Sequence, residues 1–261
     1  MKCKISDKEK IQVHYNQNAK EWIKDIDNEP TRYYFNELVK YLEEFDTQKK
    51  TLLDVGCGSG LISDFLTNYG FKKIHCLDYS SEMIKIVKKR ARSKNNIEPV
   101  VGDVENLPYK DDKFDYVICV GLLECFQCLR KALKEIKRVT KPNGKILIRW
   151  TNHEGVWGNI EKLKKKLNKP TDPNFTKYYE MDYIKRLVKE PEYDFKIIHV
   201  SGSILFPFFI LPSFLSQAFE TAFINSKLTY FFEGKVFQPV SKSPSLIKNF
   251  YYAFYTLLEK K

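Results

Sequence analysis

The sequence lacks any long hydrophobic run and any leader of the secretory type, and each absence excludes a class of protein. Charged side chains make up 30% of the 261 residues, which excludes a polytopic membrane protein. Residues 1–10 are polar and rich in lysine, and no apolar segment with a small-residue cleavage site follows, so we expect a cytoplasmic protein. Internal repeats and low-complexity linkers are also lacking. The length and the 43% hydrophobic content therefore suit one large domain with its own core.

Cysteine is scarce, with six residues in the chain. Cys76 and Cys119 lie inside apolar, strand-like runs, which favours reduced, buried thiols. Cys125 and Cys128 form a lone C-x-x-C pair, and the two further ligands that a zinc site needs are missing nearby. We therefore expect no metal site.

Lysine and arginine outnumber the acidic residues, so the net charge is +11. One interpretation is attraction to anions such as nucleic acid, acidic lipid headgroups or a phosphorylated substrate. The other is a lysine-rich sequence whose charges lie on solvated helix faces. The spacing of the basic residues in 85–92 and 162–166 is helical, which favours the second interpretation.

Strand-like and helix-like segments alternate through the middle of the chain. Short apolar runs predict five strands, at 51–55, 73–78, 99–102, 114–120 and 145–150. Helical spacing predicts intervening helices at 61–69, 81–93 and 129–140. Such alternation predicts an α/β fold, with a doubly wound, mostly parallel sheet and helices on both faces. Pro142-Asn143-Gly144 predicts a turn before the fifth strand.

We expect a single domain with four parts. Residues 1–48 form an N-terminal helical cap, and residues 49–151 form the core. Residues 152–192 form a helical insertion or lid. Residues 193–261 supply the last two strands, at 195–200 and 251–258, with an apolar, aromatic-rich lid between them, which brings the sheet to seven strands.

The strongest motif is Asp54-Val-Gly-Cys-Gly-Ser-Gly60, which follows the first strand and precedes a helix. Glycines at this place allow a sharp turn and close approach of a ligand to the backbone. A dinucleotide fingerprint is spaced G-x-G-x-x-G, whereas the spacing here is G-x-G-x-G after an acid. An acid beside the loop repels a pyrophosphate but can hold a cationic or amino-bearing ligand.

Further acids follow the next strands in order. Asp78 ends the second strand, where a carboxylate can accept hydrogen bonds from both ribose hydroxyls, as it also does in NAD proteins. Gly102-Asp103-Val104 ends the third strand, and the segments 114–124 and 132–144 follow at workable spacings. Together, over about residues 50–151, these motifs resemble those of class I, Rossmann-like S-adenosylmethionine-dependent methyltransferases of the small-molecule type.

The resemblance implies S-adenosyl-L-methionine as cofactor and assigns residues to each part of it. The glycine loop lines the methionine end, Asp78 and the next residue hold the ribose, Asp103 reaches the adenine amine, and the residues after the fourth strand lie under the sulfonium. The implied set is Tyr15, Asp54, Gly56, Cys57, Gly58, Gly60, Asp78, Tyr79, Met83, Asp103, Val104, Val120, Gly121 and Leu122. For Tyr15 and Met83, plain packing in a cap helix or in the core stays open as an alternative.

No catalytic triad is evident, and methyl transfer needs a general base only when the acceptor must lose a proton. Candidate bases are Glu124, His153 and His14. Each of them also has an ordinary structural or surface interpretation. The catalytic residues thus stay unassigned.

The acceptor is expected to be a small or apolar metabolite. The segment after the fourth strand reads Val-Gly-Leu-Leu, without the D/N-P-P-Y/F element of base amino-methyltransferases, and no basic patch with stacking aromatics argues for nucleic acid. Residues 204–215 are intensely apolar but too short to span a bilayer, which takes about 20 residues. Residues 203–216 therefore predict a substrate lid or, alternatively, a peripheral membrane contact of a lipid or quinone methyltransferase. The sequence also leaves open a catalytically inactive scaffold and an NAD-type oxidoreductase, and it predicts no oligomeric state.

Overall fold

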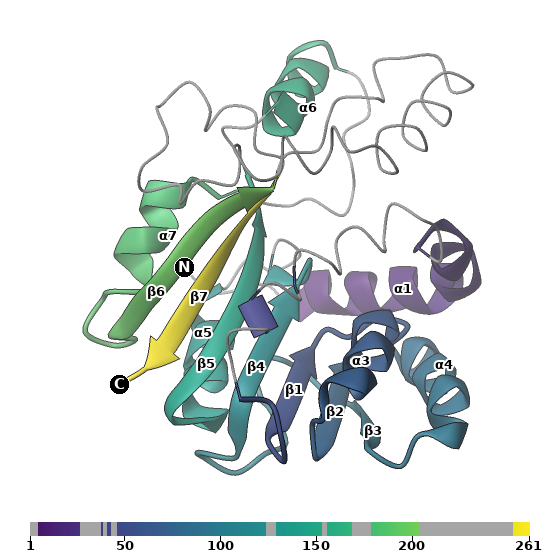
Figure 1. The fold of residues 1–261 in the computed structure, drawn as a ribbon. Helices are drawn as coiled ribbons and strands as arrows, with labels where there is room; N and C mark the ends of the chain where they lie inside the picture. Colours follow the sequence, from purple (N-terminus) through teal and green to yellow (C-terminus); the bar gives the residue numbers. More distant parts are fainter. Residues whose placement is uncertain are drawn as a thin grey trace, which may run out of the picture.

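The structure is a computed structural model. It describes residues 5–26, 38, 41–42, 46–123, 129–152, 156–168, 179–203 and 253–261. Within these residues a seven-stranded sheet forms the centre of the molecule, with strand order β3-β2-β1-β4-β5-β7-β6 (Figure 1). The predicted α/β class and strand number are therefore confirmed. The predicted aromatic lid, at 204–252, lies outside the described residues.

The strands pair in parallel except β7, which is antiparallel to both of its neighbours. Their bounds are β1 Thr51–Val55, β2 Lys73–Asp78, β3 Ile97–Val101, β4 Phe114–Val120, β5 Thr140–Thr151, β6 Phe195–Ser203 and β7 Ala253–Lys260. The strand order reverses at β1, between β2 and β4. In open α/β sheets the crevice outside the carboxyl ends of the strands at such a reversal is where ligands bind.

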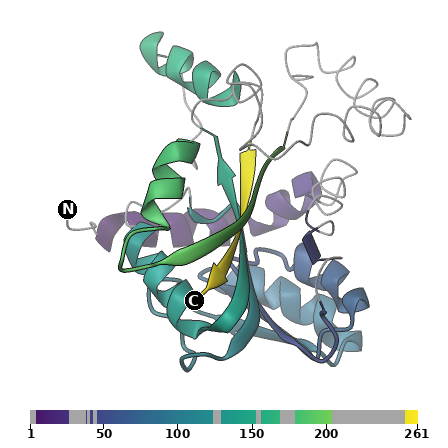
Figure 2. The same cartoon turned by 60° about the vertical axis from the view of Figure 1, so that its left-hand side comes forward.

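Helices cover both faces of this sheet (Figure 2). Their bounds are α1 Ile5–Ile26, α3 Leu61–Leu66, α4 Ser81–Arg90, α5 Leu129–Val139, α6 Val156–Lys166 and α7 Met181–Leu187, with 3-10 turns at Thr67–Tyr69 and Ala91–Ser93. The side chain of Ser80 caps α4 by accepting a hydrogen bond from the N–H of Met83. Gly70 ends the 3-10 turn after α3 in the left-handed region, with φ 79°, which glycine adopts without strain.

Two apolar layers result from the strict alternation of side chains along the strands. Leu53, Val55 and Ile146 face α5 and α7 on one side. Leu52 and Ile74 face α3 and α4 on the other. The lysines at 85, 88 and 89 are exposed on the outer face of α4, so the charge of this segment lies on a solvated helix face.

The prediction that residues 142–144 form a turn before the fifth strand is wrong in one respect. Strand β5 begins earlier, at Thr140, and includes these residues. Thr140 pairs with Phe114, and the next pair is Lys145 with Tyr116, so the residues between bulge out of the strand. The hydroxyl of Thr140 donates to the Ile136 carbonyl at 2.6 Å, which joins the end of α5 directly to the sheet. Asn143 takes the expected positive φ, 62°.

Candidate active site

The loop after β1 is shaped by glycines in the left-handed region. Gly56 has φ 71° and Gly58 has φ 52°. A β-carbon on Gly56 would lie 2.7 Å from a methyl group of Leu122, whereas one on Gly58 would meet no atom within 4 Å. A side chain at position 56 would therefore have to displace Leu122, whereas Gly58 presents bare backbone to open space. Gly121, at the end of β4, also faces open space.

Asp78 joins the ends of β1 and β2. One oxygen of its carboxylate accepts from the N–H of Gly58 at 2.9 Å, and the other accepts from the N–H of Ser80 at 2.8 Å. Burial raises the pKa of Asp78, and hydrogen bonds from these backbone amides and that of Tyr79 oppose the shift. The result is a half-buried carboxylate beside the bare backbone of Gly58.

Asp54 lies deeper, with 1% of its surface exposed. Its carboxylate accepts from the hydroxyl of Ser63, on α3, at 2.6 Å. Burial raises the pKa of Asp54 to about 7, and the nearby Asp78 adds to the increase. Asp54 therefore stabilises the junction between the loop after β1 and helix α3 from the buried side of that loop.

Asp103 follows β3 and is held from two sides. Its Oδ1 accepts from the N–H of Glu105 at 2.9 Å, and its Oδ2 lies 2.7 Å from the Nζ of Lys8 on α1. Lys8 also lies 2.5 Å from the carboxylate of Glu105. An N-terminal lysine thus bridges two acids of this loop.

Two more side chains on the same face of α1 bind the adjoining loop. Gln12 donates to the Tyr79 carbonyl at 2.9 Å, and Asn16 accepts from the hydroxyl of Ser80 at 2.6 Å. Lys8, Gln12 and Asn16 are spaced by four residues, which places them on one face of a helix. Helix α1 therefore lies across the loops after β2 and β3, where these strands end (Figure 1).

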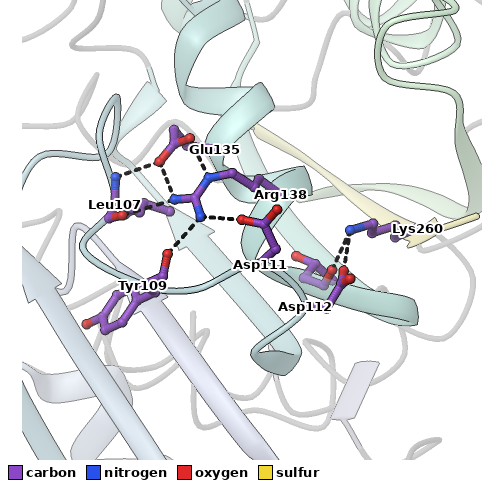
Figure 3. A network of polar contacts seen from close by, with 8 residues as sticks. Leu107, Tyr109, Asp111, Asp112, Glu135, Arg138 and Lys260 are labelled. Atoms are coloured by element: carbon purple, nitrogen blue, oxygen red, sulfur yellow. Dashed lines mark hydrogen bonds and ion pairs between the residues drawn. The ribbon is translucent and has the colours of Figure 1, made fainter.

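The loop after β3 is fixed at its far end by α5 (Figure 3). Arg138 donates to the carbonyl oxygens of Leu107 and Tyr109, at 3.0 and 2.7 Å, and to the carboxylate of Asp111 at 2.8 Å. Glu135 pairs with Arg138 at 2.7 Å and accepts from the N–H of Leu107 at 2.7 Å. The loop that carries Asp103 is thus held between two helices.

Several other residues of the predicted site lie near these loops, but their contacts do not indicate a role in ligand binding. Met83 and Val104 are 1% and 3% exposed, so their side chains offer little surface to a ligand, and their predicted roles stay predictions. The sulfur of Cys57 is buried, which matches a role through its backbone. Tyr15 is half-buried and contacts the ring of His14 edge-on, 5.4 Å between centroids. The remaining members, Gly60, Tyr79 and Val120, lie in or beside the same loops.

Among the candidate bases, His14 is on α1, where Asn18 donates to its carbonyl at 2.9 Å. Glu124 and His153 lie outside the described residues, as do Cys125 and Cys128. The described part of the chain contains no group of three or more metal-ligating side chains and no helix long and apolar enough to cross a membrane.

Sequence reasoning missed Lys8, Gln12, Asn16 and Ser63. The spacing of the first three by four residues was a visible signal, but polar residues at that spacing also describe any solvated helix face. Ser63, nine residues after Asp54, is in the first turn of α3, where a serine normally suggests helix capping. Only the partners that these side chains contact in the folded protein distinguish them from residues of an ordinary solvated helix face or helix cap.

Comparisons with known proteins agree with this geometry. A family model described as a methyltransferase domain matches residues 53–148. An uncharacterized protein of Methanocaldococcus jannaschii is 32% identical over 197 residues, 71% of each chain. The phthiotriol/phenolphthiotriol dimycocerosates methyltransferase of Mycobacterium tuberculosis is 34% identical over 121 residues, 46% of this chain and 44% of that enzyme. The chain therefore matches less than half the length of this named relative.

A solved structure extends the likeness to nearly the whole fold. A SAM-dependent methyltransferase of Thermotoga maritima has a TM-score of 0.64 and 18% sequence identity, covering 96% of this chain and 99% of that one. An acid-flanked glycine loop, acids at the next two strand ends and a mostly parallel sheet with one reversed strand define a methyltransferase-type α/β protein. The chain belongs to the class I, Rossmann-like family of S-adenosylmethionine-dependent methyltransferases.

Proposed function

We propose that this protein binds S-adenosyl-L-methionine at the carboxyl ends of β1, β2 and β3 and transfers its methyl group to a small or apolar metabolite. The observation that carries the proposal is the pairing of Asp78 with Gly58, which puts a carboxylate beside glycine backbone with open space around it, at the reversal of strand order. In this proposal residues 49–151 bind the cofactor, while residues 1–48 and 152–192 cover it.

The residues present suit such a cofactor. Bare glycine backbone at Gly58 and Gly121 leaves room that a β-carbon would fill. The acids that can reach a ligand, Asp78 and Asp103, are hydrogen-bond acceptors, and they suit hydroxyl and amine groups better than a pyrophosphate. They favour an amino-bearing nucleoside over a dinucleotide, which argues against an NAD-type oxidoreductase.

Each acid has a separate task in this proposal. Asp78 keeps lone pairs beyond those that its backbone hydrogen bonds occupy, and these accept the ribose hydroxyls. Asp103, a quarter exposed, accepts from the exocyclic amine of adenine. Asp54 is too buried for direct contact and holds the loop in shape through Ser63.

A bound cofactor would supply a methyl group that its sulfonium activates for in-line displacement by a lone pair of the acceptor. The protein's contribution is alignment and exclusion of water. Helix α1 lies over the loops after β2 and β3, which it contacts through Lys8, Gln12 and Asn16, and in this proposal it shields the cofactor from water. A proton is taken up by a base only if the acceptor must lose one, and His14, Glu124 and His153 remain the candidates.

Two features support a small or apolar acceptor. The segment after β4 lacks the element that grips a nucleic-acid base, and residues 204–215 are strongly apolar. The mycobacterial relative is named for methyl transfer to phthiotriol dimycocerosates. A peripheral membrane role for residues 203–216 stays the alternative within the same activity.

Calorimetric titration with S-adenosylhomocysteine tests the cofactor step, with Asp78→Ala as the site variant and Asp194→Asn as the control. Asp194 is half-exposed and pairs with Lys261, at the far end of the sheet. We expect binding by the intact protein and by the control, and loss of binding in Asp78→Ala. Absence of binding in the intact protein would overturn the proposal.

Transfer is tested separately, with methyl-tritiated cofactor and a fractionated cell extract that contains both small molecules and nucleic acid. Label that moves into an organic-soluble product supports a methyltransferase with an apolar acceptor. Cofactor binding with no transfer to any fraction would instead favour the inactive scaffold. Label in nucleic acid would contradict the proposed acceptor class.

A further inference from the structure

Lys8 connects α1 to the loop after β3 through two carboxylates at once. Its Nζ lies 2.7 Å from Asp103 and 2.5 Å from Glu105. The side chains of Lys8 and Asp103 are 23% and 27% exposed, and that of Glu105 is 7% exposed. Burial alone would lower the pKa of Lys8, but the hydrogen bonds that its ammonium donates to both acids raise that pKa above its ordinary value, so the ammonium stays charged.

This arrangement fixes Asp103 without using all of its acceptor capacity. Oδ1 takes the N–H of Glu105, and Oδ2 takes Lys8. An ionised carboxylate offers about four lone-pair sites, so acceptor positions remain for another donor. Because both oxygens have fixed partners, the directions of the remaining positions are fixed as well.

Loss of the lysine would leave two acids close together with no shared cation. Glu105 is nearly buried, and a carboxylate in such surroundings is costly when its partner is removed. Repulsion between the two carboxylates would then turn them apart, which would change the direction of the acceptor that Asp103 presents.

The lysine is itself held in place. Gln12 and Asn16, one and two helical steps further along α1, bind the Tyr79 carbonyl and the Ser80 hydroxyl. On the other side, Arg138 and Glu135 hold the loop at Leu107. The contact between Lys8 and Asp103 therefore joins two fixed elements.

We propose that Lys8 is a positioning residue for recognition of a 6-aminopurine: it orients the Asp103 carboxylate, which accepts from the amine of the base. This inference rests on the proposed function. It predicts that Lys8 controls discrimination between a 6-amino and a 6-oxo purine, a property that general stability of the fold does not change.

The experiment compares S-adenosylhomocysteine with S-inosylhomocysteine, in which a carbonyl replaces the amine, by calorimetry. The variants are Lys8→Met, Lys8→Gln and Lys8→Arg, with Lys85→Met as matched control because Lys85 forms an exposed ion pair with Glu82 on α4. We expect the intact protein to prefer the amino form. Lys8→Met and Lys8→Gln should weaken binding of the amino form about tenfold, as loss of one charge-assisted hydrogen bond does, and leave the oxo form unchanged. Lys8→Arg should keep most of the preference, and Lys85→Met all of it.

Each contrary outcome overturns a distinct claim. Equal loss for both ligands would mean that Lys8 only stabilises α1. Tighter binding of the amino form in Lys8→Met would mean that the lysine competes with the amine. A folded intact protein with no preference between the ligands would also overturn the inference and leave the proposed function standing. Failure of the intact protein to bind either ligand would overturn the proposed function itself.

Discussion

The carboxylate of Asp78 accepts a hydrogen bond from the backbone N–H of Gly58, over a distance of 2.9 Å. Asp78 ends β2, and Gly58 lies in the loop after β1. The second carboxylate oxygen takes the N–H of Ser80, at the start of α4. One side chain thus determines the shape of two neighbouring loops as well as the acceptor proposed for the ribose.

This double role predicts a stability cost for Asp78→Ala. The N–H groups of Gly58 and Ser80 would lose their acceptor, and we expect the free energy of unfolding to fall by about 2 kcal/mol. Urea denaturation at neutral pH measures the change. Asp194→Asn should differ from the intact protein by less than about 0.5 kcal/mol, as surface changes usually do. An unchanged midpoint for Asp78→Ala would contradict the role of this carboxylate in the loops.

Substitution by alanine should lower the stability of the protein more at Gly56 than at Gly58. A β-carbon at position 56 meets Leu122 at 2.7 Å, so Gly56→Ala adds a clash to the cost of positive φ, and we expect a loss of about 3 kcal/mol. At position 58 the space is open, so Gly58→Ala should cost only about 1–2 kcal/mol through its backbone conformation. The same methyl group would occupy the proposed cofactor space, so Gly58→Ala should lose most of its affinity for S-adenosylhomocysteine.

Thermal unfolding and calorimetry on the two variants separate these effects. Leu122→Ala combined with Gly56→Ala should recover the steric part of the loss, because the clashing methyl groups are gone. Gly58→Ala with full cofactor affinity would argue that the ligand binds elsewhere.

The central sheet was predictable because buried parallel strands are short apolar runs that end at glycine or acid. The bounds of β1 and β2 agree with the prediction to the residue. The start of β5 was not predictable, since a proline-asparagine-glycine sequence is typical of a turn, and only its pairing with β4 shows that it bulges from a strand.

For the candidate site, the acids at the strand ends were predictable and their partners were not. The partners of Lys8, Gln12 and Asn16 lie 95, 67 and 64 residues away in the sequence. A lysine in a lysine-rich helix has no local feature that separates an ion pair with the site from a solvated side chain. Local periodicity therefore indicates the helix but not what its polar face contacts.

Asp54 should make the protein less stable as the pH rises towards neutral. In the unfolded chain this carboxyl loses its proton near pH 3.8, whereas burial in the folded protein raises its pKa to about 7. Between these values the unfolded state is ionised and the folded state keeps the proton. The contribution of Asp54 is therefore fully present below the lower pKa and is lost progressively up to the higher one, at a rate of up to about 1.4 kcal/mol per pH unit.

Asp54→Asn removes this titration and keeps an acceptor for Ser63. We expect the variant to resemble the intact protein near pH 4.5 and to exceed it in stability by a few kcal/mol at pH 8. Thermal melts of both proteins across this range give the difference directly, because the other titrating groups are common to both. A difference that stays constant with pH would show that Asp54 is ionised in the folded protein throughout.

Arg138 should contribute more to the free energy of unfolding than a charged side chain near the surface usually does. It donates to the Leu107 and Tyr109 carbonyls and pairs with Glu135 (Figure 3), and its side chain is 31% exposed. Arg138→Met leaves these acceptors without their donor, and we expect a loss of about 2 kcal/mol, measured by urea denaturation. Arg138→Lys should recover little of it, since an ammonium cannot reproduce the planar fork of donors.

Arg130 provides the matched control. Its ion-pair partners are Glu190 and Glu192, which are exposed carboxylates, and half of its own side chain is exposed. Arg130→Met should therefore cost less than about 1 kcal/mol. Equal losses in the two variants would mean that the backbone contacts of Arg138 add nothing to an ordinary surface ion pair.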